Sequence, residues 1–525
     1  MKKWLLCCAL GIASIVLVGH WGGLLHRNSP AATLQGNTLA YTRYQDSRRV
    51  FSIRAANMQA QMGSTAEFNQ VQISFFNADD RLLALVQCQK LEADANRKQW
   101  RSKHPVQVMV QFPASSLGTW TLQARSLQFD EDSGLLRVVD VTGSGSAGRR
   151  LIAHTVQIHA GETQTLLEKM IVVNDASQQI EASQGKLNWK EKILHVNHLQ
   201  MQSRNAQLQA GEAELPLDDS RIRNMRAWGG VAIQTNNDGV QRSATSLRME
   251  ADLDEKGAIR ILHPHGRVHY EEASHGRTPA WQASSADAQI DPKTSRILLQ
   301  GAALVQDAQM RLTAGTVLVQ RTTGEVMAHD SVELTRTEAD GSQTQIRANS
   351  ASLRKAMGIA HFVGAARLTS TNGAFDAPYM SLQWLRHTVK ADADQTHPAE
   401  MHWQISGQTE NRTALHLAAQ HISCDNEAHR LHASGNARME EPNAQVQATR
   451  MDLDFEPAHT NAPMAAKLLR WNASGDIQWN SGAREARAEE IACEEENGAC
   501  VLRGLNAWMR DTTQDLHLPI IKFTE

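Results

Sequence analysis

The stretch Arg296-Ile297-Leu298-Leu299-Gln300-Gly301, followed by Ala303 and Val305, decides the fold. Apolar residues recur at every second position on both sides of the glycine, and this period of two predicts a β-strand. A glycine between the two halves favours a bend in the strand or a close approach of two backbones, where a larger side chain would not fit. The stretch therefore predicts a strand with an apolar face that continues past a central bend.

The same frame recurs along most of the chain in two versions. In one version a glycine precedes apolar residues at +2 and +4, and this version follows Gly229, Gly266, Gly364, Gly435 and Gly475, with Asp330 in the place of the glycine. In the other an alanine precedes apolar residues at +3 and +5, and it follows Ala124, Ala153, Ala210, Ala244 (Leu247 and Met249), Ala314, Ala377, Ala448 and Ala488. From Ala124 the steps to Ala153, Ala182 and Ala210 are 29, 29 and 28 residues. A regular period with two strands per unit predicts a stacked β array in which neighbouring units bury each other's apolar faces.

Composition excludes several classes of protein. The 53 Lys and Arg against 56 Asp and Glu give a net charge of −3, so nucleic acid is not an expected partner. Six cysteines in 525 residues exclude a disulfide scaffold. No hydrolase, metalloprotease or P-loop signature is present, and no pair of carboxylates argues for acid–base chemistry. The stretch 143–148 fits G-x-G-x-x-G, but a strand rather than a helix is expected after it, so we expect a turn there and not a dinucleotide site. We therefore expect neither an enzyme nor a cofactor.

The first 27 residues predict a membrane anchor. Lys2 and Lys3 precede a stretch without formal charge, 4–25, which is long enough to cross the hydrocarbon layer of a membrane as a helix. The flanking lysines should stay in the cytoplasm, which predicts a single-pass membrane protein with its bulk on the far side of the membrane. The alternative is a cleaved signal peptide, because the strongest apolar part spans only 5–18 and Ala31-Ala32 follows.

The inward-facing positions of the array are mostly aliphatic, and aromatic residues make up 5% of the chain. Such positions fit a closed core between two sheets, and they also fit an open cleft for aliphatic chains. If the cleft is correct, its lipid-binding trough is formed by Val231, Ile233, Val268, Tyr270, Leu299, Val305, Val317, Val319, Val332, Leu334, Phe362, Leu368, Met380, Leu382, Met439, Met451, Leu453, Ile477 and Trp479.

These patterns resemble the periplasmic lipopolysaccharide-transport proteins of the OstA-like superfamily, which includes LptA and LptC. The stretches 296–301 and 360–364 resemble that family's element of apolar strand, glycine and apolar strand, and 346–353 resembles its alternate strand. The single anchor, 51–55 and 71–76 resemble LptC. The resemblance divides the chain into an anchor at 1–27, an LptC-like β domain at 40–150 and an LptA-like repeat array at 151–525.

The resemblance implies an elongated open jelly roll of stacked antiparallel strand pairs, in which acyl chains lie in an apolar trough. It implies a membrane-anchored scaffold that passes lipopolysaccharide, or a related glycolipid, from an inner-membrane ABC transporter toward the outer membrane. Further OstA-like modules would join by pairing of edge strands. The alternative from another class is a structural or adhesive β-solenoid with a closed core and no ligand.

Two groups of side chains, three histidines and two cysteines, have chemistry that the apolar pattern does not explain. His263, His265 and His269 share the outward parity of one strand, so exposed polar residues are expected there rather than a metal site. Cys493 and Cys500 both face inward, but a two-residue turn at Asn497-Gly498 would put Cys493 opposite Leu502, and a disulfide between the two cysteines requires a different register.

The C-terminal end of the array leaves two interpretations open. The strand near 501–509 is a candidate edge for pairing with another module. Alternatively, the tail 511–525 covers that edge.

Overall fold

A computed structural model describes residues 33–525, apart from 62–64, 78, 95–97, 112–118, 146–149, 160–163, 175–177, 189–190, 204–205, 219–220, 223, 238, 255–258, 277–278, 339–340, 371–372, 407–411, 457–467, 483, 496–497, 513 and 525. The predicted anchor at 1–27 lies outside the described residues. Across the part of the chain that is described, no helix has the length and apolar character needed to cross a membrane.

The described residues form strands almost throughout, with one 3₁₀ turn at Lys355–Met357, so the all-β prediction is confirmed. The chain divides into two compact units. The first contains residues 1–196 and 217–220, and the second contains 197–216 and 221–525.

The first unit is an antiparallel array in which each strand pairs with strands close to it in sequence. Its aromatic core joins Phe51 to Phe129 and Phe75 to Phe129, with ring centroids 4.8 and 5.2 Å apart in edge-to-face geometry. Phe51 and Phe75 lie in the stretches 51–55 and 71–76, for which the sequence predicts an LptC-like domain. Its strands are β1 (Thr33–Gly36), β2 (Leu39–Gln45), β3 (Arg48–Gln61), β4 (Ala66–Phe76), β5 (Leu82–Asp94), β6 (Gln99–Ser102), β7 (Val106–Gln111), β8 (Thr119–Asp130), β9 (Leu135–Ser144), β10 (Arg150–His159), β11 (Gln164–Asn174) and β12 (Gln178–Asn188).

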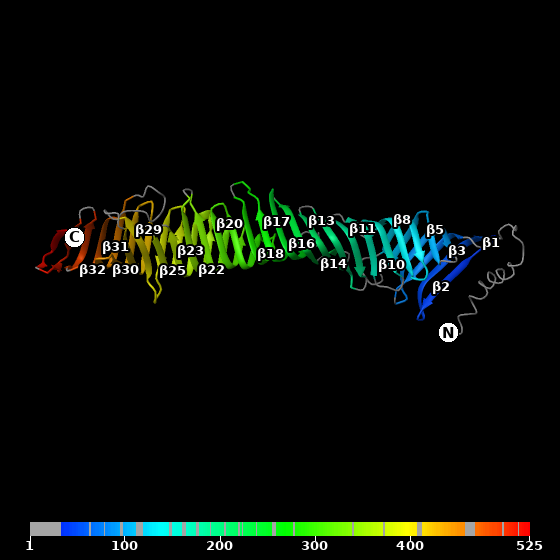
Figure 1. Ribbon diagram of the computed structural model, residues 1–525, viewed down its shortest axis with the longest axis horizontal. Helices are drawn as coiled ribbons and strands as arrows, with labels where there is room; N and C mark the ends of the chain where they lie inside the picture. Colours follow the sequence, from blue (N-terminus) through cyan, green and yellow to red (C-terminus); the bar gives the residue numbers. More distant parts are fainter. Residues whose placement is uncertain are drawn as a thin grey trace. The chain divides into compact units, whose positions relative to one another are not determined.

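Strands β13 (Ile193–Ser203) and β14 (Ala206–Asp218) contain residues of both units. The second unit continues with β15 (Arg221–Ile222), β16 (Asn224–Asn237), β17 (Val240–Leu253), β18 (Ile259–Glu272), β19 (Trp281–Asp291), β20 (Arg296–Asp307), β21 (Met310–Gln320), β22 (Glu325–Thr337), β23 (Gln343–Arg354), β24 (Ile359–Ser370), β25 (Gly373–Gln383), β26 (Thr388–Asp392), β27 (Ala399–Ser406), β28 (Arg412–Ala419), β29 (His421–Asp425), β30 (Arg430–Glu440), β31 (Ala444–Phe455), β32 (Leu468–Ser481), β33 (Arg484–Glu494), β34 (Ala499–Arg503), β35 (Trp508–Arg510), β36 (Asp515–His517) and β37 (Ile520–Thr524). From β16 to β25, and again from β30 to β32, the strands lie side by side in chain order (Figure 1).

Each long strand of the second unit has a bulge near its middle, which we call the corner. Between β20 and β21, for example, the register shifts between Gln300 and Ala303, and the two intervening residues, Gly301 and Ala302, have φ of 77° and 50°. A side chain on Gly301 would start 2.9 Å from the Cβ of Ala286 on β19, so this corner needs a glycine for space as well as for φ. In β22 the corner is Asp330-Ser331, with φ of 68° and 60°, as the sequence frame predicts for Asp330.

The strands fold over at their corners, so that the unit consists of two facing walls. Pairing registers place Glu272 and Asp307 level with the start of β21, and Arg321 and Lys355 level with its end. In a flat sheet these levels would be roughly 33 Å apart, at about 3.3 Å per residue. Arg321 nevertheless forms an ion pair with Glu272 at 2.8 Å, and Lys355 forms one with Asp307. Only a fold at the corner brings the two ends of the strands together.

The first wall contains 224–228, 259–265, 296–300, 325–329 and the equivalent segments of later strands. The second wall contains 231–237, 268–272, 303–307 and 332–337 and their equivalents. The corners join the walls along one side. The opposite side, where the strand ends of both walls meet, is called the mouth.

Between β25 and β30 the strands no longer cross both walls. The second half of β25 pairs with β26, while its first half pairs with β27. In the first wall β26 pairs with β29, and in the second wall β27 pairs with β28. The strand pairs of the two walls meet again at β30, which pairs with both β28 and β29. This strand is continuous across a corner between Ser434 and Ala437.

The C-terminal tail covers the edge that the sequence offered as a pairing site. β34 pairs with β33 on one side and with β37 on the other, and β35 lies between β33 and β36. The interpretation of 501–509 as a bare edge is therefore wrong, because the tail has folded back and taken up its hydrogen-bonding groups. The alternative, in which the tail 511–525 covers this edge, is confirmed.

Candidate functional site

The predicted trough residues all face the space between the two walls. Every one of them is less than a tenth exposed except Val305, which is partly exposed. Leu299, Val317, Val319, Phe362, Met380, Leu382, Met451 and Leu453 lie in the first wall, and the others lie in the second. The predicted parity thus holds on both sides of the corners.

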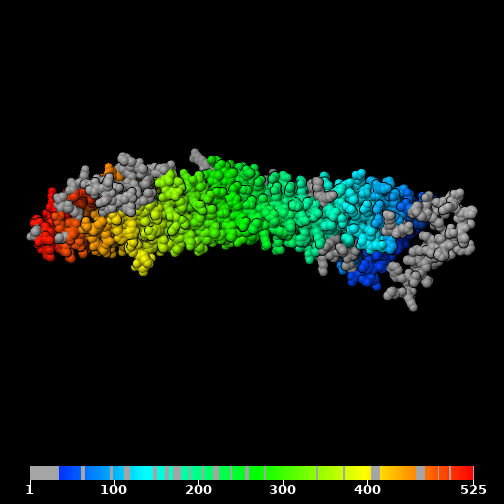
Figure 2. All heavy atoms as spheres, viewed as in Figure 1, coloured from blue at the N-terminus to red at the C-terminus, as the bar shows by residue number. Residues whose placement is uncertain are grey.

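The walls lie close together in this structure. On the face shown in Figure 2, atoms of the stretch from β16 to β24 form a continuous cover, with no groove running along it. In the neighbouring stretch, Trp403 of the second wall contacts Phe455 of the first, with ring centroids 4.1 Å apart. The inward rows therefore contact each other here as a core.

One predicted inward position is wrong. Leu247 is 53% exposed, and the neighbouring Ser246 is buried in its place. The frame fails because the corner of β17 falls between Thr245 and Arg248, so that position +3 lies on the corner itself. There the side chain of Leu247 packs against Gly266. A Cβ on that glycine would lie 3.2 Å from Leu247 Cδ1.

A buried charged cluster crosses the mouth near β18. Glu272 is 8% exposed, and it accepts hydrogen bonds from the Tyr270 hydroxyl at 3.0 Å and from Arg242 Nε at 3.4 Å. Arg321 comes from the other wall: its Nη2 donates to Glu272 Oε1 at 3.0 Å, while its Nε, 2.8 Å from Oε2, is not aligned to donate. Burial, the largest cause, raises the pKa of Tyr270, so its hydroxyl stays protonated and remains a donor. This cluster ties the walls together at the mouth.

A cavity of about 250 Å³ lies directly inside this cluster. Its lining combines aliphatic side chains of both walls with the two arginines, and includes Ile233, Leu262, Ile290, Ile297, Arg242 and Arg321. Ligand pockets in proteins usually hold about 300–1,000 Å³. The cavity is thus too small for a lipid with several acyl chains unless the walls move apart.

The four described cysteines comprise one bonded pair and two separate thiols. Cys493 and Cys500 lie directly opposite each other on β33 and β34 and form a disulfide. The register differs from that of a two-residue turn because the connection spans 495–498, which puts Leu502 opposite Ile491 instead. Cys88 and Cys424 are free, and burial raises the pKa of their thiols to about 11 and about 12, so neither is a reactive thiolate at neutral pH.

The histidines of β18 each have a separate environment. His265 Nδ1 lies 2.9 Å from Asp287 Oδ1, and His269 Nε2 lies 2.8 Å from Glu271 Oε1. Both side chains are almost half exposed, and they form ion pairs of the kind found on protein surfaces.

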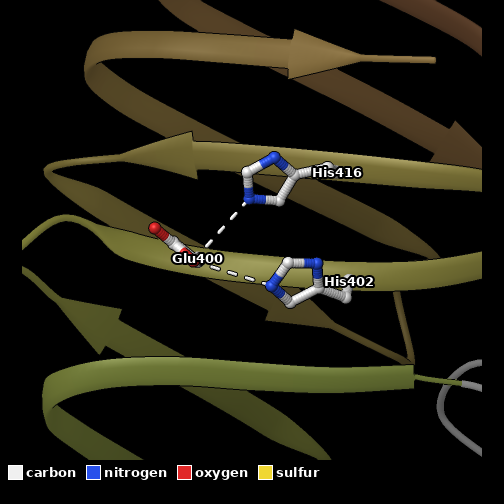
Figure 3. A group of neighbouring side chains, drawn as sticks. All are labelled: Glu400, His402 and His416. Atoms are coloured by element: carbon white, nitrogen blue, oxygen red, sulfur yellow. Dashed lines mark ion pairs between the residues drawn. The ribbon is translucent and has the colours of Figure 1, made fainter. Parts of the chain in front are cut away.

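Sequence reasoning missed a different group, formed by Glu400, His402 and His416 (Figure 3). Glu400 and His402 lie two residues apart on β27, and His416 lies directly opposite His402 on β28. The hydrogen bond from His416, together with the neighbouring Arg438, lowers the pKa of Glu440, which lies opposite His416 on β30. The Glu-x-His spacing at 400–402 is a weak signal by itself, and the third residue depends on a register that neither strand reveals alone.

Comparison with known proteins adds one family. Residues 227–354, about a quarter of the chain, match the family model described as "Lipopolysaccharide-assembly, LptC-related". No curated protein sequence matches the chain. Among solved structures, LptH of Pseudomonas aeruginosa, described as the LptA homologous periplasmic component of the lipopolysaccharide transport device, matches with 15% identity and a TM-score of 0.21, over 22% of this chain and 84% of its own.

The family match falls on β16 to β23, within the stretch predicted as the LptA-like array. It does not extend to 40–150, where likeness to LptC stays a prediction. At a TM-score of 0.21 the structural match supports no functional conclusion. The predicted resemblance to lipopolysaccharide-transport proteins is confirmed on residues 227–354.

Proposed function

We propose that the chain carries lipopolysaccharide or a related glycolipid through an aqueous compartment, without catalysing a reaction. One observation carries this proposal. The stretch that matches a lipopolysaccharide-assembly family, 227–354, is also a two-walled array whose inward rows are mainly aliphatic on both sides of the corners.

The energetics of acyl chains explain why such an array suits this task. Exposing a methylene group to water costs about 0.8 kcal/mol, so a lipid with several long chains needs continuous apolar cover. The rows from Val231 to Trp479 supply aliphatic surface strand after strand. The sugars and phosphates of the lipid would stay outside, in water.

Entry of acyl chains requires the walls to part at the mouth. The corners join the walls covalently, whereas at the mouth they are held by side chains, through the Arg321–Glu272 and Lys355–Asp307 ion pairs. The cavity inside the Glu272 cluster is already bounded by both walls and is partly apolar. Lipid chains in the array would replace contacts between the rows with contacts to hydrocarbon.

The location and partners are proposed on the same basis. Residues 1–27 would anchor the chain in the inner membrane, and the bulk would lie in the periplasm next to an ABC transporter. The Cys493–Cys500 disulfide is compatible with that oxidising compartment. Since 501–509 is covered, pairing with a further β module at this end would use β36 and β37.

A second function is favoured by the closeness of the walls. The inward rows are buried against one another, as expected for a structural β-solenoid with a permanently closed core. In that protein the same residues would stabilise the fold and would never contact a lipid.

Photocrosslinking distinguishes the two functions. A photoreactive amino acid is placed at Phe362, which is 1% exposed between the walls, and in a matched control at the next residue, Val363, which is 43% exposed on the outside. The full-length protein is incubated with purified lipopolysaccharide, illuminated and probed for glycolipid adducts. Lipid transport predicts strong adducts from position 362 and few from 363.

A variant at 362 that folds, as judged by its thermal transition, and gives no more adduct than the variant at 363 would exclude the carrier function and favour the closed solenoid.

A further inference from the structure

The outer face of the second wall carries a polar cluster between β27, β28 and β30. The pairing registers put His402 opposite His416, and His416 opposite Glu440, so that these side chains form one row across the three strands. Glu400 lies on the same face, two residues before His402. Its Oε2 is 3.6 Å from His402 Nε2 and 3.7 Å from His416 Nε2 (Figure 3).

Glu440 fixes the orientation of the His416 ring. Its Oε2 lies 3.3 Å from His416 Nδ1, while its Oε1 accepts one hydrogen bond from Gln445 Nε2 and forms an ion pair with Arg438. A carboxylate accepts only, so Nδ1 of His416 carries the proton. In the neutral ring the lone pair of Nε2 then lies in the plane of the ring, on the side of Glu400 (Figure 3).

His416 Nε2 is buried, faces the carboxylate of Glu400 and has no hydrogen-bond partner among the described residues. The rings of His402 and His416 stack with centroids 4.5 Å apart and an interplanar angle of 7°. A single metal ion next to the two nitrogens and the carboxylate would supply the partner that His416 Nε2 lacks.

We propose that Glu400, His402 and His416 bind a zinc ion, with a fourth position open to water. Around a tetrahedral zinc with bonds of about 2.0–2.1 Å, ligand atoms lie roughly 3.3 Å apart. The two measured separations from Glu400 exceed this by a few tenths of an ångström, and all three ligand atoms lie within 4.8 Å of one another. To complete the site, the nearly parallel rings would turn toward each other so that both nitrogens face one ion.

The types of ligand select the metal. Two imidazoles and a carboxylate suit zinc and its neighbours among the first-row transition metals, whereas calcium and magnesium prefer oxygen ligands throughout. The contact between His416 Nδ1 and Glu440 is the outer-shell carboxylate that commonly orients a zinc-bound histidine.

The ion would join two strands that lack the continuity found elsewhere in the array. Glu400 and His402 come from β27 and His416 from β28, and both strands belong to the second wall only. Zinc would thus hold β27 and β28 together on the outer face of the second wall, away from the apolar rows. This role does not depend on lipid transport.

Zinc binding by the full-length protein tests the proposal, with a chromophoric chelator as competitor and zinc as the only metal. We expect one tight site per chain. His402→Ala and His416→Ala should each weaken it by more than about 100-fold, and Glu440→Gln, which changes only the outer-shell contact, by about 10–100-fold.

His421→Ala is the matched control. His421 lies opposite Asp392 on a neighbouring strand pair, with its Nδ1 2.8 Å from Asp392 Oδ1, but no third ligand is grouped with it among the described residues. This variant should keep the tight site. Thermal unfolding in the presence of a chelator shows whether each variant folds, and His402, at 51% exposure, is the substitution least expected to disturb the fold.

Two results would overturn the proposal. One is a folded wild-type protein that takes up no zinc against the chelator. The other is a folded His402→Ala variant that binds zinc with the affinity and stoichiometry of the wild type.

Discussion

Two stretches, β16 to β23 and β26 to β29, both bury apolar residues between the walls, but their strands are arranged differently. In the first, each strand runs through both walls and turns at a corner such as Gly301-Ala302. In the second, each strand belongs to one wall, and the chain changes wall through the connection 393–398 or at Gln420. Both stretches nevertheless keep their apolar residues between the walls.

The difference shows that the inward pattern alone does not require continuous strands. The continuous strands β16, β18, β20, β22 and β24 turn at two consecutive residues with positive φ, which glycine adopts readily. The strands between them, β17, β19, β21 and β23, cross both walls with a bulge that has no positive φ, so the lack of such a corner does not by itself divide the ladder. The divided stretch is also where the outer face carries the non-repeating group of Glu400, His402 and His416.

The largest expected effect comes from placing a charge between the walls in each stretch. Leu299 on β20 and Leu417 on β28 are both 0% exposed. Replacement of either by Glu should destabilise the second unit by about 4 kcal/mol, because a carboxyl group is buried without a partner and apolar contacts are lost. Chemical denaturation measures the loss.

The spread of the damage should differ between the two variants. Because β20 crosses both walls, Leu299→Glu should raise hydrogen exchange in the first and second walls alike. Leu417→Glu should raise it in β27 and β28 and leave β26 and β29 protected. Equal spread in both variants would mean that the division of the strands has no mechanical consequence. Leu298→Glu, on the outward side of β20, is the control and should change little.

A smaller effect is expected from substitutions at the corner. Gly301→Ala must hold an alanine at φ of 77° with its Cβ 2.9 Å from that of Ala286, and should cost about 2–3 kcal/mol. Gly324, in the turn between β21 and β22, has φ of 66° but open space around it, so Gly324→Ala should cost only about 1 kcal/mol. The difference between the two free energies of unfolding isolates the close approach at the corner. Equal losses would show that φ alone makes the corner selective for glycine.

Much of the fold follows from the sequence because the repeat encodes both strands and corners. The parity frame placed the trough residues between the walls, and Asp330 at a corner, since alternation and bends are local properties of the chain. It failed at Leu247, because the corner of β17 lies two residues later relative to Ala244 than the corner of β21 does relative to Ala314, and an expected inward side chain is turned outward.

The remaining features depend on contacts between residues distant in sequence. Arg321 meets Glu272 across 49 residues, and only the folding of the walls brings them together. The Cys493–Cys500 register depends on the length of the connecting turn, and the group at Glu400 depends on the pairing of β27 with β28. No periodic signal reports any of these pairings.

The smallest expected effect concerns the carboxylates that fix turns in the two stretches. In the divided stretch, Asp394 Oδ1 accepts backbone hydrogen bonds from Thr396 and His397, both at 2.7 Å, and these lower its pKa to about 2. In the continuous stretch, Asp291 holds the turn between β19 and β20, where the backbone N–H of Thr294 is the main cause of a lowered pKa. Both turns rely on an ionised carboxylate.

Because the folded pKa of Asp394 is lowered, its stabilising contribution is complete above the unfolded value of 3.8 and is lost as the pH falls through about 2. The Asp394→Asn variant should therefore show a flatter pH dependence of unfolding in that range than the wild type, and Asp291→Asn should change the slope in the same direction. Carboxyl chemical shifts followed by NMR give the two pKa values directly. A normal pKa for Asp394 together with a lowered one for Asp291 would mean that the connection 393–398 is not held by its aspartate, and that the divided stretch changes wall through a loosely fixed turn.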